Sequence, residues 1–464
     1  MNLSDDIYLM PFQMTTLKQI EKFEGRCYLA LEMGLGKTAI SLWALQRNPQ
    51  WYPALVVCPA SVKINWEHET MMHIGERPFI CESREPPVFN RRDLTHIPKV
   101  TIINYDIFRY WAGYLKEIGI KTLILDEAHY LQNRSSKRTK AVRTFSRKVP
   151  QIFALSGTPI RNRPFELFPV LNILWPKQYN SFWSFGQDFC EPKKKPWGWE
   201  YKGASNLDRL NSDLTDIGMV RYRKADVLKE LPNKVRRTVL CELSDRKEYH
   251  SASTDFISWL KKNNPHKVKP ASKAMKLTRL GALLRLCATL KLPAVVNWAN
   301  RFLEETDEKL ILFAHHKVII DGLKDQIKYK SVKIVGSTPN RERQQAVEQF
   351  QADKKTRLFI GSEAAAVGIT LNAASTLGFA EMWWRPSDHE QAEARPHRIG
   401  QTEKVWINYF VAPNTVEERL CAILKEKQRI TNQAMDGKNV SGDFNIHSDL
   451  LKLLEDATNN DKQK

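Results

Sequence analysis

The sequence of 464 residues lacks the features of a secreted, membrane-spanning or metal-stapled protein. Its apolar runs fall short of the roughly 18 residues that a bilayer-spanning helix needs. The first ten residues, MNLSDDIYLM, are acidic where a secretion signal would be basic. Its seven cysteines lie far apart without a CxxC pair, which argues against a zinc site and against a disulfide framework. We therefore expect an intracellular chain in a reducing compartment, with no membrane partner.

Positive charge is what the sequence has in excess. Lys and Arg total 71 against 52 Asp and Glu, which gives a net charge of +19 at pH 7, and 42% of the residues are hydrophobic. That hydrophobic share is enough for packed domains, and the length predicts two to four of them at about 150 residues each. The positive excess favours a polyanionic partner, nucleic acid before a membrane surface.

Short apolar runs recur in two series, separated by stretches long enough for helices. Runs of this kind are typical of strands buried on both faces of a parallel sheet, and parallel pairing requires crossover helices. The sequence therefore predicts two α/β lobes, with strands at Cys27–Leu31, Ala54–Cys58, Val100–Ile103, Thr122–Leu125 and Ile152–Leu155 and then at Leu310–Phe313, Val332–Val335, Arg357–Ile360, Thr376–Ala380 and Val405–Val411.

The stretch between the two series has a different composition. Residues 175–240 are rich in proline, tryptophan and charge, with helical patterning in Asn206–Asp213. Ile257–Lys291 holds nine Lys or Arg and no Asp or Glu, whereas a surface helix usually mixes both signs. We interpret it as a helical connector beside a polyanion. The polar C-terminal stretch predicts a short helix with a frayed end.

A glycine-containing loop, EMGLGKT at residues 32–38, follows the first predicted strand and opens a helical run. Backbone N–H groups of such a loop surround phosphates, and the helix N-terminus adds its positive dipole end; the predicted phosphate-binding residues are Met33, Gly34, Leu35 and Gly36. Lys37 would reach the β- and γ-phosphates of ATP, and the Thr38 hydroxyl would ligate Mg²⁺. Because the strict pattern has a glycine where Leu31 stands, the loop alone leaves a chance GKT open.

A second motif, DEAH at residues 126–129, ends the predicted strand Thr122–Leu125. Asp126 would hold Mg²⁺, through a water, and Glu127 would accept a proton from, or orient, the water that attacks the γ-phosphate. An acidic turn after a strand would explain a lone acidic pair. It does not explain an apolar strand leading into DEAH in a chain that also carries GKT.

The motif series resembles that of superfamily-two helicase-like ATPases, and more narrowly the Swi/Snf-related family of double-stranded-DNA translocases. The segments that carry the resemblance are EMGLGKT, DEAH, LSGTPIRNRPFEL, RYRKADVLKELPNKVRR and QAEARPHRIGQ. The phrases LFAHHKVIID, GSTPNRERQQAVEQF and QAEARPHRIGQT are most similar to the annealing-helicase (HepA-related) branch. The resemblance covers roughly residues 8–430.

The resemblance implies an α/β fold of two RecA-like parallel-sheet lobes with helical insertions between them, and ATP with Mg²⁺ in the cleft between the lobes. We expect an ATP-binding lobe at residues 1–175, helical insertions and a basic linker at 176–290, a helicase C-terminal lobe at 291–435 and a polar tail at 436–464. With no accessory domain visible, we expect a bare monomeric motor from a bacterium or a virus-infected bacterial cell, in the cytoplasm or nucleoid.

The resemblance also assigns roles to single residues. It implies that Gln13 reads adenine, and that Ser156 and Thr158 couple the phosphate site to DNA. Gln391, Arg395 and Arg398 would project from the second lobe onto the nucleotide, where guanidinium groups stabilise phosphoryl transfer. The chain departs from the family at Ala394 and Pro396, which flank the first arginine. Since proline disrupts a helix, both arginines are expected on a kinked or terminating helix.

Translocation needs contacts to phosphates that do not read sequence. Besides Ser156 and Thr158, the candidates lie after predicted strands: Ser61, Lys63, Asn104, Ser337, Thr338, Ser362 and Thr370. An ordinary polar loop is the alternative for each. The triplet Lys193–Lys195 precedes PWGW, residues 196–199, where base stacking is conceivable but packing of a small subdomain is favoured. We also expect Trp383 and Trp384 to pack within their lobe.

The predicted function is that of an ATP-dependent double-stranded-DNA translocase, a DNA-dependent ATPase that remodels or reanneals duplex or branched DNA without sequence preference. A strand-separating helicase on forked DNA or RNA shares the ATP motifs and stays open. A DNA-binding scaffold that does not hydrolyse ATP stays open as well, because of Pro396.

Overall fold

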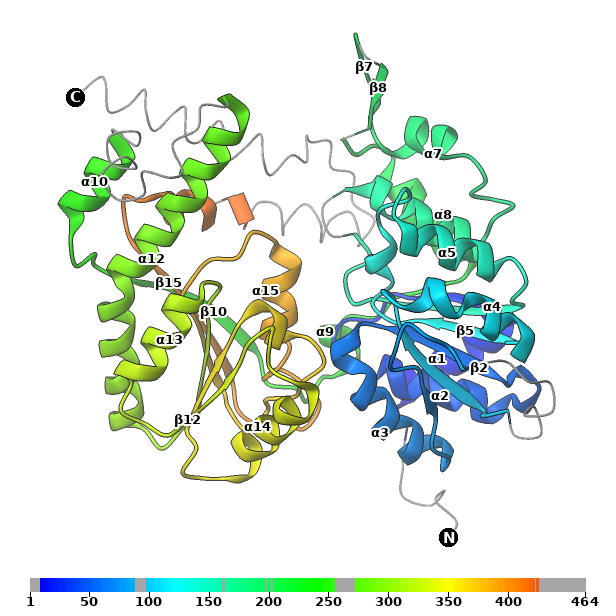
Figure 1. Cartoon of the computed structure of the whole chain (residues 1–464), viewed down its shortest axis with the longest axis horizontal. Coiled ribbons are helices and arrows are strands. Elements are labelled where there is room, and N and C mark those ends of the chain that lie inside the picture. Colours follow the sequence, from blue (N-terminus) through cyan, green and yellow to red (C-terminus); the bar gives the residue numbers. More distant parts are fainter. Residues whose placement is uncertain are drawn as a thin grey trace. The chain divides into compact units, whose positions relative to one another are not determined.

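The computed structural model describes residues 9–87, 97–160, 163–196, 198–201, 203–254, 272–421, 423 and 424, and for residues 272–278 the helical backbone alone. The described residues form two compact units, and the division falls between Glu230 and Leu231. Each unit contains one parallel sheet with helices packed on it (Figure 1). The predicted α/β class with two parallel-sheet lobes is confirmed. The predicted tail at 436–464 lies outside the described residues.

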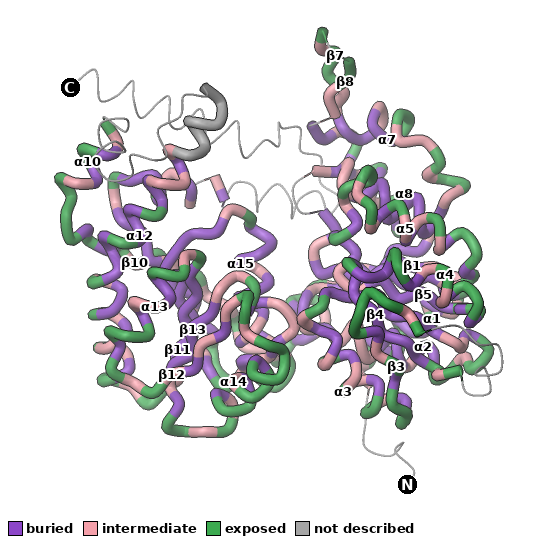
Figure 2. The backbone as a smooth tube through the Cα atoms, in the orientation of Figure 1, coloured by how far each residue is buried: buried purple, intermediate pink, exposed green. Residues whose placement is uncertain are grey.

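The first unit is built on a seven-stranded sheet among the described residues, with the strand order β3-β4-β2-β5-β6-β1-β9. Neighbouring strands are all parallel. The strands are β1 (Arg26–Leu29), β2 (Ala54–Cys58), β3 (Phe79–Ile80), β4 (Val100–Asn104), β5 (Thr122–Leu125), β6 (Gln151–Leu155) and β9 (Met219–Val220). The central strands are buried along their length, because helices cover both of their faces (Figure 2).

All described helices of the first unit except the short α9 fall into two groups. Side chains of α4, α5, α6, α7 and α8 share one apolar core with inward residues of β2, β5 and β6 such as Leu55, Leu123 and Ile152. The helices α1, α2 and α3 pack against one another as the second group. The bounds are α1 (Pro11–Lys22), α2 (Lys37–Arg47), α3 (Lys63–Ile74), α4 (Phe108–Ile118), α5 (Lys137–Ser146), α6 (Phe168–Leu174), α7 (Phe182–Phe189), α8 (Leu207–Ile217) and α9 (Lys224–Val227).

The second unit is built on a six-stranded sheet among the described residues, with the order β10-β15-β14-β11-β13-β12 and parallel neighbours throughout. Its strands are β10 (Lys234–Leu240), β11 (Leu310–Phe313), β12 (Ser331–Ile334), β13 (Leu358–Gly361), β14 (Thr376–Phe379) and β15 (Val405–Val411). Alternate residues of β11 face two different cores: Leu310 and Leu312 pack with α12 and α13, whereas Ile311 and Phe313 pack with α14 and α15.

The helices of this unit are α10 (Arg246–Thr254), α12 (Ser272–Glu305), α13 (Lys317–Gln326), α14 (Asn340–Ala352) and α15 (Pro386–Glu393). Arg279–Glu305 of α12 is long and apolar enough to cross a membrane, but most of its apolar window is buried inside the unit, so it serves as a core helix. The basic stretch that ends at Lys291 is therefore not a uniform charged surface. Lys291 is fully buried against Glu417, and residues 257–271 lie outside the described part of the chain.

The partition into units differs from the predicted boundaries at 175/176 and 290/291. Residues up to Glu230 belong to the first unit because β9 pairs with β1 and extends its sheet. Residues from Leu231 belong to the second unit because β10 pairs with β15 over seven residues. A buried carboxylate fixes this pairing: Glu393 accepts from Lys234 Nζ at 2.7 Å and from Arg236 Nη2 at 2.6 Å.

Candidate functional site

The predicted nucleotide-site residues of the first unit gather at one edge of its sheet. The EMGLGKT loop follows β1, Asp126 follows β5, and Ser156 follows β6. Because the strands are parallel and β5, β6 and β1 are consecutive in the sheet, their carboxyl ends lie side by side. Crevices at the carboxyl ends of such strands are the usual ligand sites of open α/β sheets.

The loop before α2 has the backbone of a phosphate-binding turn. Gly34 and Gly36 have φ angles of +85° and +76°, and Gly36 is the residue immediately before the helix. Gln13 lies against this loop: its Nε2 donates to the Leu35 carbonyl at 3.3 Å, and a Cβ on Gly36 would come within 2.5 Å of the same nitrogen. The structure therefore brings the predicted adenine-reading residue onto the predicted phosphate loop.

Lys37 is the first residue of α2, and its ammonium is directed back to the start of the loop. Its Nζ donates to the Leu31 carbonyl at 2.8 Å and to the Glu32 carbonyl at 3.4 Å. The loop is held from the other side as well, since Glu32 Oε2 accepts from the Lys224 N–H at 2.8 Å. Thr38 follows in the first turn of the helix and is half-buried.

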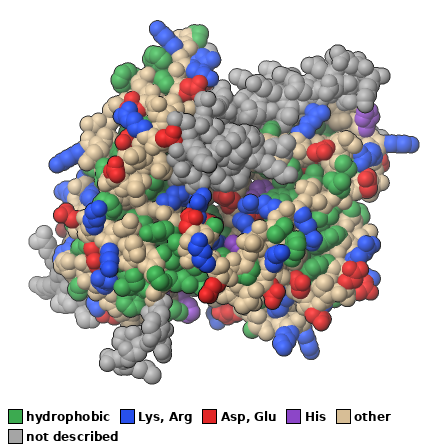
Figure 3. Space-filling view, turned by 180° about the vertical axis from the view of Figure 1, so that it is seen from behind, with side chains coloured by type: hydrophobic (Ala, Val, Ile, Leu, Met, Phe, Trp, Pro, Cys, Tyr) green, Lys and Arg blue, Asp and Glu red, His purple; other side chains and the backbone are tan. Residues whose placement is uncertain are grey.

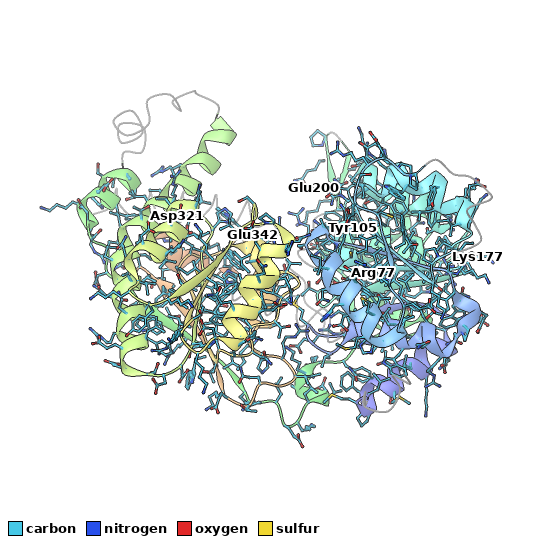
Figure 4. The ribbon with its side chains drawn as sticks, turned by 60° about the horizontal axis from the view of Figure 1, so that its bottom comes forward. Arg77, Tyr105, Lys177, Glu200, Asp321 and Glu342 are labelled. Atoms are coloured by element: carbon cyan, nitrogen blue, oxygen red, sulfur yellow. The ribbon has the colours of Figure 1, made fainter. Side chains whose placement is uncertain are left out.

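Asp126 is the most tightly fixed acid of the site. Its Oδ2 accepts from Trp66 Nε1 at 2.8 Å and its Oδ1 accepts from the Glu127 N–H at 2.9 Å. The Tyr105 hydroxyl donates to the Asp126 carbonyl at 2.7 Å, and Figure 4 labels Tyr105 among the side chains of the first unit. Burial raises the pKa of the Asp126 carboxyl to about 6 and the Glu127 charge adds to the rise, whereas Trp66 and Lys37 oppose it. The carboxylate is thus preorganised and would gain from a nearby cation.

The second acid, Glu127, connects to the loop after β6. It has a left-handed backbone with φ of +49°, and its Oε2 lies 3.2 Å from His129 Nδ1. The same His129 nitrogen lies 3.5 Å from Ser156 Oγ, which accepts from the Thr158 N–H at 3.2 Å. Gly157 in turn packs on Met33, since a Cβ there would lie 2.5 Å from Met33 Cγ. The acid, the phosphate loop and the predicted coupling residues thus form one contact network.

These residues fit ATP with Mg²⁺. A loop of glycines before a helix N-terminus offers N–H groups to phosphate oxygens, and Lys37 supplies a positive charge. The hydroxyl of Thr38 and the carboxylate of Asp126 are the oxygen ligands that Mg²⁺ prefers. Burial and the neighbouring Glu127 charge raise the pKa of Asp126, so a cation bound beside this carboxylate would stabilise its charged form.

In the second unit the predicted arginines lie just beyond a helix end. The helix α15 stops at Glu393, so of the two expected arrangements, a kinked or a terminating helix, the structure has the second, and both arginines lie beyond the helix end instead of on the helix. Arg395 Nη1 donates to the Ile369 carbonyl at 3.1 Å, and Arg398 Nη1 donates to Thr370 Oγ1 at 2.5 Å. The structure therefore brings Arg395 and Arg398 together on one loop, with the carbonyl of the buried Gln391 accepting from Arg395 Nε at 3.1 Å.

The predicted DNA-contact residues divide into surface and interior positions. Ser337 is exposed, and Thr338 Oγ1 closes its turn by accepting from the Val335 N–H at 3.0 Å. Ser362 follows the neighbouring strand β13, close to this turn, because a Cβ on Gly336 would lie 3.7 Å from Ala364 Cβ. In the first unit Ser61 is half-buried in the 3-10 turn Ala60–Val62, which precedes α3.

Three of the DNA-contact candidates are placed differently from the prediction: Lys63, Asn104 and Ser156, of which Ser156 is fully buried behind its contact with His129. Lys63 is nine-tenths buried, and its Nζ donates to the Cys81 carbonyl at 2.6 Å, so its charge is directed into the unit instead of toward a phosphate. Burial lowers the pKa of this lysine. Asn104 is also buried, as the last residue of β4. A strand-end position predicts which edge a residue occupies but not whether its side chain reaches the surface.

The tryptophans that were expected to pack differ in their exposure. Trp383 is 1% exposed and Trp384 is half-buried against a neighbouring core, so the expectation of lobe packing is confirmed. The expectation of packing is wrong for Trp199, which is 49% exposed on a projecting hairpin. Trp197 lies outside the described residues.

Three further residues of the site carried no role in the sequence interpretation. Trp66 and Tyr105 fix Asp126 from 60 and 21 residues away, and His129 connects Glu127 to Ser156. DEAH itself marks His129, but no local pattern singles out Trp66 or Tyr105, since their significance depends on which strands are neighbours.

Comparison with known proteins identifies the family. The SNF2-related domain matches residues 14–292, and the helicase conserved C-terminal domain matches residues 291–400. The chain belongs to the SNF2-related family. It is 33% identical over 448 residues to DNA annealing helicase and endonuclease ZRANB3 of Mus musculus, covering 93% of this chain and 41% of that protein.

A frog relative is similar to this chain at the same level of identity. The SWI/SNF-related matrix-associated actin-dependent regulator of chromatin subfamily A-like protein 1 of Xenopus tropicalis is 33% identical, over 92% of this chain and 45% of that protein. This SNF2-related chain thus spans less than half the length of these relatives. The ATPase core of Sulfolobus solfataricus SWI2/SNF2 with dsDNA covers 97% of this chain and 95% of that one at 22% identity and a TM-score of 0.43, so the family assignment depends on the sequence matches.

The comparisons correct one expectation. A bacterial or viral source, with the cytoplasm or nucleoid of a bacterium as the location, was expected from the absence of accessory domains. The mouse and frog relatives, and one from Caenorhabditis elegans that is 32% identical over 92% of this chain, are eukaryotic proteins. The expectation is wrong because the sequence of this chain matches one part of longer eukaryotic proteins.

Proposed function

We propose that this SNF2-related chain is a DNA-dependent ATPase that uses ATP hydrolysis to move along duplex DNA and to remodel or reanneal it. The observation that carries the proposal is the network at the carboxyl edge of the first sheet. There Asp126 is fixed by Trp66, and Glu127 connects through His129 to Ser156. Such a network suits an enzyme in which the state of the phosphate site must be transmitted to another ligand.

The nucleotide would be held by residues of the first unit. Lys37 and the N–H groups of residues 33–36 would bind the phosphates, Gln13 the adenine, and Thr38 with Asp126 the Mg²⁺. The cation supplies positive charge to the phosphate oxygens when it is bound. Lys37 would exchange the carbonyls of Leu31 and Glu32 for phosphate oxygens, at the cost of those two hydrogen bonds.

Glu127 would orient the attacking water and accept its proton. Its side chain is mostly buried, which keeps bulk water from competing for that position. We propose that Arg395 and Arg398 of the second unit supply the guanidinium charge that stabilises the transferring phosphoryl group, with Gln391 beside them. The Thr370 hydroxyl that binds Arg398 would link this loop to the DNA-contacting turns around Ser337, Thr338 and Ser362.

Several observations support DNA as the partner. The net charge is +19, which favours sequence-independent attraction to phosphates. Figure 3 shows Lys and Arg side chains on the surface, interspersed with Asp and Glu. The mouse relative is named a DNA annealing helicase. The half-buried Ser61 and Thr158 of the first unit would add neutral phosphate contacts, which position a duplex without reading its sequence.

The test is a panel of ATPase rates with blunt duplex, single strands, forked DNA and RNA. We expect the blunt or branched duplexes to stimulate hydrolysis most; a preference for RNA would refute the proposal. Glu127→Gln should abolish turnover and spare ATP binding, whereas Glu117→Gln, an exposed glutamate on α4, should change neither. Equal turnover in the Glu127→Gln variant and the wild type would point to a scaffold that does not use this site.

A further inference from the structure

A small hairpin projects from the first unit and takes no part in its sheet. It consists of β7 (Lys193–Lys195) and β8 (Gly198–Glu200), which pair only with each other among the described strands (Figure 1). Its base is fixed to α7, because Tyr201 packs on Gly186 and makes an edge-to-face contact with Phe182 at 5.4 Å between ring centres. The hairpin therefore exposes its side chains to solvent, while its base is held in place by packing against α7.

The two faces of the hairpin differ in charge. Residues directly opposite each other in an antiparallel pair share a face, and neighbours along a strand alternate. Lys194 is opposite Trp199, so an exposed ammonium and an indole that is 49% exposed share one face. Lys193 is opposite Glu200 and lies 3.8 Å from Glu191, so acidic groups offset its charge.

A half-exposed tryptophan paired with a lysine is a chemical match for one nucleotide. An aromatic ring stacks on the face of a base, and an adjacent cation contacts the neighbouring phosphate. In a closed duplex both faces of every internal base are covered by the next base pairs. Away from the duplex ends, Trp199 can therefore reach a base face only where a base is unpaired, at a gap, a fork or a loop.

We propose that the face formed by Lys194 and Trp199 binds an unpaired nucleotide of DNA, with the indole stacked on the base and the ammonium on the phosphate. The inference rests on the proposed function and extends it: the motor moves along duplex DNA, and the hairpin gives it a preference for duplex that contains unpaired bases. Stacking is tolerant of base identity, so this preference is one of structure and not of sequence.

The experiment compares a blunt duplex with the same duplex carrying unpaired thymines on one strand, using the full chain. The measured quantity is the DNA concentration that gives half-maximal ATPase stimulation. We expect Trp199→Ala to raise this concentration roughly five- to tenfold for the duplex with unpaired bases and to leave the blunt duplex unaffected. Trp199→Phe, which keeps an aromatic face, should restore most of the preference.

Matched lysine variants separate this contact from general charge attraction. Lys194→Ala should weaken binding of the duplex with unpaired bases and reduce its salt dependence, whereas Lys193→Ala, on the opposite face, should have a smaller effect. Equal losses for the two lysines, or a Trp199→Ala variant that keeps the wild-type preference, would overturn the proposal. A greater effect on unpaired RNA than on unpaired DNA would overturn the choice of partner.

A binding measurement without ATP makes this inference independent of hydrolysis. A 2-aminopurine placed among the unpaired bases loses fluorescence when it stacks on an aromatic side chain. We expect the wild type to quench it and Trp199→Ala not to. Quenching without any DNA-stimulated hydrolysis would refute the proposed motor and leave the hairpin site standing; stimulated hydrolysis without quenching would do the reverse.

Discussion

Replacing Asp126 with asparagine should make the nucleotide-free protein more stable while it destroys the ATPase. The pKa of Asp126 is raised from an ordinary 3.8 to about 6, chiefly by burial and then by the Glu127 charge. The folded state therefore holds this proton more tightly than the unfolded chain. The contribution of Asp126 to the free energy of unfolding falls as the pH rises from 3.8 to 6. It stays reduced above pH 6, because the folded state must then carry an unfavourable buried carboxylate charge.

The magnitude follows from the shift. About two pKa units correspond to a destabilisation of about 3 kcal/mol above pH 6. Asparagine removes the charge but accepts only one of the two hydrogen bonds that Trp66 Nε1 and the Glu127 N–H now donate, which costs about 1 kcal/mol. A net gain of about 1–2 kcal/mol should raise the Tm of the first unit by about 2–4 °C per kcal/mol.

The assay is thermal unfolding of the wild type and Asp126→Asn without nucleotide at pH 8 and pH 5. The gain should be present at pH 8 and should shrink at pH 5, where the wild-type carboxyl is protonated. Asp106→Asn serves as a control, since that side chain is 69% exposed in the same unit. A lower Tm for Asp126→Asn at pH 8, or a gain of the same size at both pH values, would refute the electrostatic reasoning.

Three further predictions concern the interior of each unit. Glu417→Gln should destabilise the second unit by about 3–5 kcal/mol in thermal unfolding. The substitution leaves the fully buried Lys291 ammonium without the carboxylate that now lies 2.6 Å away. Glu418→Gln, at an exposed position, should leave the stability unchanged. Burial lowers the pKa of His389 to about 4, so the folded state disfavours the proton. The free energy of unfolding should therefore fall by about 2 kcal/mol between pH 7 and pH 5. A His389→Gln variant whose stability falls by the same amount over this pH range would disprove this cause. His129→Ala should lower the ratio of the DNA-stimulated to the basal ATPase rate roughly two- to tenfold. This factor is the equivalent of losing one hydrogen bond of about 0.5–1.5 kcal/mol. An unchanged ratio would exclude a role of His129 in coupling Glu127 to Ser156.

The local pattern of apolar residues was sufficient to predict the bounds of two buried strands. Ala54–Cys58 and Thr122–Leu125 were predicted to the residue, because strands covered on both faces are continuous apolar runs bounded by turns. The strand β10, KVRRTVL, was missed. It is an edge strand whose arginines are exposed or paired with Glu393, so its hydrophobic signal is weak and its partner β15 lies about 170 residues further on.

By itself the sequence determined the α/β class, the family and the edge of the sheet where a nucleotide would be held, because these depend on short motifs and on the alternation of strands and helices. Tertiary structure alone decided that Lys63 and Lys291 lie inside the protein, that Trp199 lies outside it, and that Trp66 and His129 fix the acids of the site. The physical reason is that burial, hydrogen bonding and the pKa of a group depend on neighbours brought together by strand order, and residues distant in sequence leave no local pattern of that proximity.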